Sequence, residues 1–190
     1  GSKKIVGRLN ELLSGELTAA DQYFTHSRMY EDWGLGVLSE RIKHESEEEL
    51  EHADALIKRI LFLDGTPDLS VRAGLKIGST VAEMMANDLE LEISVARELK
   101  DVIQLAEAEK DFVTREILED MLKTTEEDHM YWLETQLELA AAEKMELVAQ
   151  LHEHEQQAMD TRRQEMAVVE QMGRQLTDCN DEIPQARTFS

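Results

Sequence analysis

Residues 64–79, DGTPDLSVRAGLKIGS, decide the fold, because they separate two helical halves of the chain. This stretch holds three glycines and a proline, residues that interrupt helices. It is also much longer than ordinary connections between neighbouring helices, so it can span the length of a helix pair. We therefore expect residues 64–79 to be the single long crossover between two antiparallel pairs of helices.

Helical patterns lie on both sides of this connection. Apolar residues recur with helical spacing over about 3–32 and 37–63 before it, and over about 81–107 and 112–139 after it. In the second segment the inward positions are 38, 42, 45, 49, 52 and 56. Ser79 or Thr80, with Glu83 following Thr80 by three residues, predicts a capping box before the third helix. Together these features predict an all-α four-helix bundle with one long crossover.

The composition limits the functions that the chain can have. Its 190 residues are enough for one domain with a substantial core, and 41 acidic against 20 basic residues give a net charge of −21. This charge disfavours nucleic acid and anionic membranes as partners and favours cations. The lone Cys179 cannot form an intrachain disulfide, and no apolar run is long enough to span a membrane. We therefore expect a soluble, cytoplasmic protein.

The C-terminal part of the chain has a looser helical pattern. We expect a bundle over residues 3–142, a short fifth helix over 143–156, and a C-terminal extension over 157–190 that is partly helical or disordered. His152 and His154 are either metal ligands near a channel or exposed side chains. Arg162 and Arg163 are candidates for pairing with acidic neighbours or docking a partner.

Each of the four predicted helices places a carboxylate near mid-length on its apolar side. In chain order the residues are Glu16, Glu49 with His52, Glu92, and Glu126 with His129. Converging buried carboxylates repel one another strongly unless protons or metal cations neutralise them. Two divalent ions would offset four carboxylates, with Glu49 and Glu126 bridging them. A mixed carboxylate and imidazole shell suits iron or manganese, with zinc also possible.

This pattern, Glu from two helices and Glu-x-x-His from the other two, is typical of di-iron carboxylate bundles. The alternative is that the six residues lie at the edge of the core and are satisfied by hydrogen bonds. Asp88, one turn before Glu92, is either an acceptor that orients a ligating histidine or a solvated acid. Tyr23 is either an electron donor beside the metals or an ordinary core tyrosine.

Several segments resemble bacterioferritin and the closely related non-haem bacterial ferritins. The resemblance covers roughly residues 4–140 and implies a hollow cage of 24 subunits. Each subunit of this family oxidises Fe(II) with O₂ or H₂O₂ at an internal di-iron site, and the cage stores ferric mineral. The segments are LLSGEL at 12–17, DQYF at 21–24, HES at 44–46, EHAD at 51–54, RILFL at 59–63, EEDH at 126–129 and WLE at 132–134.

The resemblance also assigns roles to individual residues. The six ligands of the family match Glu16, Glu49, His52, Glu92, Glu126 and His129. His44 and Glu48 match a pair on the inner surface that helps to pass iron or electrons toward the cavity, although the family usually has Asp where Glu48 stands; the alternative is that both are solvated surface groups. Leu50 stands where bacterioferritin has its haem-binding methionine, so haem is disfavoured here, although a mixed cage with a haem-binding subunit is compatible with the sequence.

Two other functions fit the same residues. One is a di-iron or di-manganese oxidase, oxygenase or peroxide-detoxifying bundle that stores no iron. The other is a structural bundle whose C-terminal segment recruits a partner or targets the assembly. The resemblance favours a ferroxidase and iron-storage protein over both.

Overall fold

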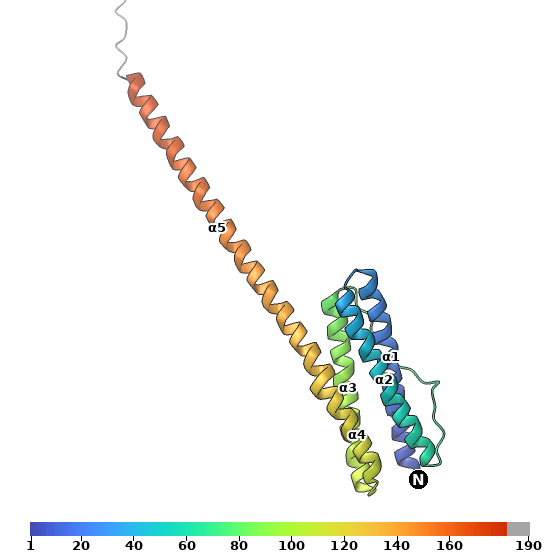
Figure 1. The fold of residues 1–190 in the computed structure, drawn as a ribbon. Helices are drawn as coiled ribbons and strands as arrows, with labels where there is room; N and C mark the ends of the chain where they lie inside the picture. Colours follow the sequence, from blue (N-terminus) through green and yellow to red (C-terminus); the bar gives the residue numbers. More distant parts are fainter. Residues whose placement is uncertain (182–190) are drawn as a thin grey trace, which may run out of the picture. The chain divides into compact units, whose positions relative to one another are not determined.

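The computed structural model describes residues 1–181, with side chains described up to residue 176. The chain divides into a unit over Gly1–Ala140 and a second unit from Ala141 onward, which we describe separately. Residues 182–190, the end of the predicted extension, lie outside the described residues. The elements in Figure 1 are α1 Lys3–Asp32, α2 Gly36–Phe62, α3 Val81–Ala108, α4 Phe112–Thr124, the π-helix η1 Thr125–Met130, and α5 Tyr131–Asp181.

The predicted all-α fold is confirmed, since the described residues contain helices and no strand. Helix α1 packs along α2, α3 packs along α4 and η1, and α1 also packs against α3. Gly34, with a φ of 77°, makes the tight turn between α1 and α2. The α3 helix begins at a Thr80 cap whose Oγ1 accepts from the Glu83 backbone N–H at 3.2 Å. The Glu83 carboxylate accepts from Ser79 N–H, one residue before the cap, at 2.9 Å, so the predicted cap by Thr80 is confirmed and the return bond of the box goes to Ser79.

The crossover between α2 and α3 lies along α1 and is held there by polar side chains. One row of α1 positions, each four residues apart, hydrogen-bonds to the backbone of the crossover. Asn10 Oδ1 accepts from Asp68 N–H, Ser14 Oγ donates to the Val71 carbonyl, Thr18 Oγ1 accepts from Ala73 N–H, and Gln22 Oε1 accepts from Lys76 N–H, at 2.8, 3.0, 3.1 and 2.9 Å. Because the row follows the spacing of one helix face, the crossover must track the axis of α1.

The bundle has two clusters of buried apolar side chains. The larger cluster includes Leu9, Leu56, Leu99 and Leu118, and the smaller one includes Tyr23, Tyr30, Ile42 and Met84. Along α2, Glu49 falls between Ile42 and Ala53, and along α3, Glu92 falls between Met84 and Val95, residues that belong to opposite clusters. A polar layer therefore separates the two parts of the core.

The fourth helix of the bundle contains one wide turn, η1, which the regular spacing of the sequence did not predict. The buried positions before, within and after this turn are Met121, Thr125, His129 and Leu133, each four residues apart. A regular α-helix would drift off the core face over such a series, and a π turn, which holds one extra residue, keeps it in line. The inward face thus passes through Thr125 and His129, and Glu126 lies beside this face.

The segment after the bundle differs from the expected short helix over residues 143–156. Helix α5 continues without a break from Tyr131 to Asp181. The physical reason is that neither glycine nor proline occurs between Tyr131 and Met172, so nothing ends the helix. Every side chain from Ala141 to Leu176 is exposed. The described part of the chain contains no helix with the length and apolarity needed to cross a membrane.

Candidate metal centre

Three glutamates from three helices are buried together in the polar layer of the bundle. Glu16 on α1, Glu49 on α2 and Glu92 on α3 have 0%, 1% and 1% of their surface exposed. Helical spacing explains this placement, since each residue lies on the same face as the apolar residues of its helix. Moving three carboxylates out of water into the core costs free energy, so the cluster requires positive charge or protons nearby.

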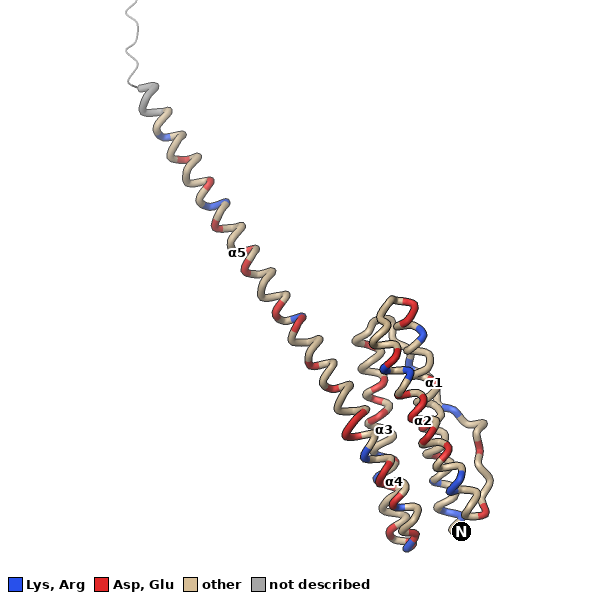
Figure 2. The backbone as a smooth tube through the Cα atoms, viewed as in Figure 1, with Lys and Arg blue, Asp and Glu red and all other residues tan. Residues whose placement is uncertain are grey.

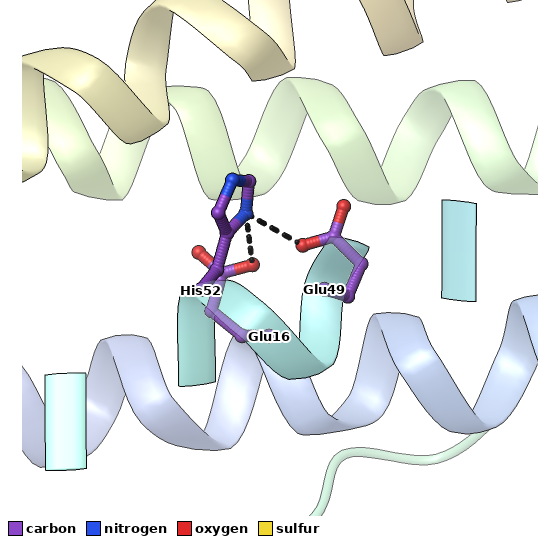
Figure 3. A group of neighbouring side chains, drawn as sticks. All are labelled: Glu16, Glu49 and His52. Atoms are coloured by element: carbon purple, nitrogen blue, oxygen red, sulfur yellow. Dashed lines mark hydrogen bonds and ion pairs between the residues drawn. The ribbon is translucent and has the colours of Figure 1, made fainter. Parts of the chain in front are cut away.

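His52 brings Glu16 and Glu49 into one candidate metal group. Its Nδ1 lies 3.0 Å from Glu49 Oε2 and 3.6 Å from Glu16 Oε2. Figure 3 shows both carboxylates turned toward the imidazole. One ligand atom from each of the three side chains lies within 4.8 Å of the others, close enough to hold a single ion.

His129, from the π turn, forms a second group that shares Glu49 with the first. Its Nδ1 lies 2.8 Å from Glu49 Oε1 and 3.4 Å from Glu92 Oε1. The ring centroids of His52 and His129 are 6.2 Å apart. Glu49 therefore stands between two three-residue groups, in the position of a carboxylate that could bridge two ions.

Unsatisfied polar atoms of this cluster fit a metal. Both Glu16 carboxylate oxygens, Glu49 Oε1 and His129 Nδ1 are buried and have no well-aligned hydrogen bond among the described residues. Buried polar atoms are normally paired, so unpaired oxygens and nitrogens that converge on one point are what a cation site requires. Oxygen and imidazole donors suit iron, manganese or zinc.

The pKa values of the three glutamates also indicate that the cluster is stable only with positive charge or protons nearby. Burial, followed by the charge of Glu49, raises the pKa of Glu16 well above its usual value. Burial and Glu49 likewise raise the pKa of Glu92 to about 7. Burial alone would raise the pKa of Glu49, but hydrogen bonds from Glu16, His129 and His52 lower it below the usual value. Glu49 thus keeps its charge while its neighbours hold protons.

The two histidines hold protons strongly in the metal-free protein. Burial lowers the pKa of His52, but hydrogen bonds to Glu16 and Glu49 outweigh it and raise the pKa to about 10. The pKa of His129 is also raised, because hydrogen bonds to Glu45, Glu49 and Glu92 outweigh its burial. Protons therefore occupy the places that metal ions would take.

Glu126, the sixth predicted ligand, does not join the cluster in this structure. Its side chain is 39% exposed and pairs with Lys100 of α3 at 2.5 Å. The π turn explains the difference, since it directs Thr125 and His129 to the core and leaves Glu126 beside them. Its role as a ligand stays a prediction.

Glu45, which was not among the predicted site residues, lies beside His129. It is 3% exposed, and its Oε2 lies 2.6 Å from His129 Nε2. Glu48 Oε2 lies 3.1 Å from the same nitrogen, and the three residues form a further group that could hold a metal. His44 Nε2 lies 3.6 Å from Glu48 Oε1, with its own side chain 58% exposed. The inward position of 45 in the α2 pattern was the signal that could have identified Glu45.

Two further predicted residues lie beside the cluster. Tyr23 is buried and its hydroxyl donates to Glu92 Oε1. Burial, then the charges of Glu92 and Asp88, raise the pKa of Tyr23 well above its usual value, so the phenol keeps its proton. Asp88 orients a histidine, but this is His26, whose Nδ1 lies 2.9 Å from the carboxylate, and not a predicted ligand.

The remaining predicted positions are exposed. Leu50 is 52% exposed on α2 and offers no donor atom for haem iron. His152 and His154 are exposed on α5 and belong to none of the metal groups found among the described residues.

Comparison with known proteins decides the family. The model of the ferritin-like domain matches residues 6–142. The chain belongs to the ferritin-like family. It is 56% identical over 142 residues to the bacterial ferritin of Paramagnetospirillum magnetotacticum, which covers 74% of this chain and 87% of that protein. It is 55% identical over 141 residues to the bacterial ferritin of Pseudomonas aeruginosa, covering 74% of this chain and 91% of that protein.

The similarity to bacterioferritins is lower. The bacterioferritin of Mycolicibacterium paratuberculosis is 42% identical over 139 residues, covering 73% of this chain and 87% of that protein. The predicted family is thus confirmed, and these similarities support iron storage as the function of the ferritin-like chain.

Proposed function

We propose that this ferritin-like protein is a ferroxidase as well as an iron store, with the buried cluster around Glu49 as its site of Fe(II) oxidation. The observation that carries the proposal is the pair of adjacent three-residue groups that share Glu49. Two Fe(II) ions are the substrate, one in each group. Each Fe(II) gives up one electron to become Fe(III), and one oxidant molecule accepts the pair together with two protons: O₂ then becomes H₂O₂, or H₂O₂ becomes two water molecules.

The residues of the cluster provide negative charge for the cations, and its protonated groups are a source of protons for this reaction. Glu16, Glu49 and Glu92 supply three negative charges for two cations, and the two imidazoles are neutral once a metal displaces their protons. Tyr23 stays protonated beside Glu92, which fixes the direction of that carboxylate and places a phenol next to the site. We propose Tyr23 as an electron donor in this position: where the oxidant takes up an electron beyond the pair from the two Fe(II) ions, the phenol supplies one electron together with its proton.

Glu126 completes the ligand set in our proposal by turning away from Lys100. An exposed ion pair of this kind stabilises by about 0.2–1 kcal/mol, so exchanging it for a cation costs little. The π turn that carries Glu126 and His129 supports the proposal, since such turns are frequent at functional sites.

Iron storage requires an assembly with a cavity, and we propose the 24-subunit cage typical of the family. Acidic residues are spread over the bundle helices, as Figure 2 shows, and the net charge of −21 per chain attracts Fe(II). His44 and Glu48, in contact with the site through His129, are proposed as the route from the site to the cavity. The cytoplasmic location stays a prediction.

The test replaces both proposed bridging carboxylates. Glu49→Ala with Glu126→Ala is expected to abolish fast Fe(II) oxidation, and the metal-free protein is expected to fold with lower stability, because Glu49 is the buried partner of His52 and His129. The matched control is Glu51→Ala with Glu127→Ala, which changes neighbouring glutamates that face solvent. Unchanged oxidation by the first variant would refute the site.

Iron retention separates storage from simple oxidation. After aerobic loading and gel filtration, a storage protein is expected as a cage-sized particle that holds far more than two irons per chain. A small particle that retains only two irons would instead support the oxidase that stores no iron.

A further inference from the structure

The exposed segment of α5 from Ala141 to Leu176 carries a stripe of positions repeated every seven residues. The positions are Ala141, Val148, Glu155, Arg162, Val169 and Leu176. Apolar residues flank this stripe within one turn on either side, namely Met145, Leu151, Ala158, Met159, Met166 and Met172. A seven-residue repeat sustained over this length is the pattern of a coiled coil, which needs a second helix.

Within the C-terminal unit, which is a single helix over its described residues, nothing packs against the apolar residues of this stripe. Met145, Val169 and Leu176 are 75%, 68% and 69% exposed. A helix of this length in water gains most of its stability from packing an apolar face, which a single copy does not do here. The charges of Glu155 and Arg162 within the stripe decide which partner helix can pack against it.

The stripe is symmetrical about its centre, between Ala158 and Met159. Reading outward from that centre, Glu155 corresponds to Arg162, Leu151 to Met166 and Val148 to Val169. Farther out, Met145 corresponds to Met172 and Ala141 to Leu176. From the centre outward, the pairs of corresponding residues are therefore first apolar, then charged, then apolar. The two charged residues, Glu155 and Arg162, are opposite in sign.

We propose that this segment pairs with the same segment of a second copy of the chain in an antiparallel arrangement centred between Ala158 and Met159. In this register Glu155 of each copy meets Arg162 of the other, and apolar residues meet apolar residues on both sides. A parallel pair would instead place Glu155 against Glu155 and Arg162 against Arg162, which repel. Within the described residues neither Glu155 nor Arg162 has an ion pair or a hydrogen bond, so both charges are free for the partner.

The flanking residues agree with the same register. His152 on one side of the stripe meets Glu165 on the other side in the partner copy. The pairing is independent of the proposed ferroxidase activity, because it uses none of the residues of the metal centre.

Cysteine cross-linking tests the direction and the register together. In full-length protein carrying Cys179→Ser, we would prepare Val148→Cys, Val169→Cys and the double variant, and oxidise each one mildly. Residues 148 and 169 are about 31 Å apart along one helix, so they cannot join within a chain. The double variant is expected to give covalent dimers on a non-reducing gel, and each single variant is expected to stay monomeric. Dimers from the single variants would show parallel pairing, and no dimers from any variant would also overturn the proposal.

Charge reversal tests the polar centre. Glu155→Arg or Arg162→Glu alone, added to the double-cysteine chain, is expected to lower the yield of covalent dimer at least threefold. Both reversals together are expected to restore it, because the opposite charges meet again. Glu153→Arg and Arg174→Glu make the same charge changes on the other face of the helix and serve as controls. Failure of the combined reversal to restore the dimer would refute the register.

Discussion

Metal binding to the cluster around Glu49 should release protons, because protons occupy the site in the metal-free protein. His52, with a pKa of about 10, and His129, with a raised pKa, each hold one proton at pH 7. Glu92, with a pKa of about 7, holds half of a proton, and burial together with the charge of Glu49 raises the pKa of Glu16 well above its usual value. Two Zn(II) ions, which are not oxidised, should therefore displace at least two protons per chain at pH 7, those of His52 and His129.

The same pKa values set the direction of the pH dependence. Protons compete with the metal, so metal affinity should rise between pH 6 and pH 8 as Glu92 ionises. His52 has a folded pKa above its ordinary value of 6.5, so its contribution to stability is full below pH 6.5 and is lost as the pH rises through about 10. The stability of the metal-free protein should thus fall toward alkaline pH, and less so with zinc bound.

Proton release can be measured directly with a pH-stat in unbuffered protein solution. His52→Gln should lower the release by about one proton, whereas His154→Gln, which changes an exposed histidine that belongs to none of the metal groups, should leave it unchanged. Fewer than one proton per bound zinc in the unchanged protein would show that the metal binds elsewhere, and the reasoning on the cluster would be refuted.

Three further predictions concern single side chains. Arg59→Met should lower the free energy of unfolding by about 3 kcal/mol, measured in urea, because it leaves Asp111, which Arg59 pairs with at 2.6 Å, without its cation. Lys100→Met should free Glu126 and strengthen zinc binding up to about fivefold in a competition titration, since the exposed pair is worth at most about 1 kcal/mol. An unchanged zinc affinity would mean that the pair with Lys100 does not hold Glu126 away from the metal. Leu50→Met should allow haem uptake, seen as a haem absorbance band in the purified protein, and its absence would show that the surrounding pocket differs.

The helices and the crossover were predictable because each rests on local chemistry. Glycines and a proline mark residues 64–79 as a connection, and the capping box at Ser79–Glu83 marks the start of α3. Glu16, Glu49 and Glu92 could be placed in the core because regular α-helical spacing holds along α1, α2 and α3. Where the spacing is regular, a face of a helix can be read from the sequence.

The rest could not be predicted because it depends on a departure from that spacing or on long-range contacts. The π turn changes which residues of the fourth helix face inward, so Glu126 pairs with Lys100 although an unbroken α-helix would have buried it. Glu45 is inward on the pattern of α2, but its contact with His129 depends on how α2 meets the π turn. The sequence favours a fifth helix shorter than α5 because the apolar pattern there is loose, although neither glycine nor proline occurs between Tyr131 and Met172 to end the helix.

The wide turn at Thr125–Met130 also makes the length of this helix adjustable at one place. A π turn is an α-helix with one residue inserted, and the helix on each side keeps its own packing. Removing Thr124, the residue directly before this turn, would let the turn close into ordinary α-helix while Leu118 and Leu133 stay in the core. Stability and the geometry of the site are then separable by a single deletion. In this helix, the gain or loss of one residue at the wide turn alters the positions of the metal-site side chains while the packing of the core is kept.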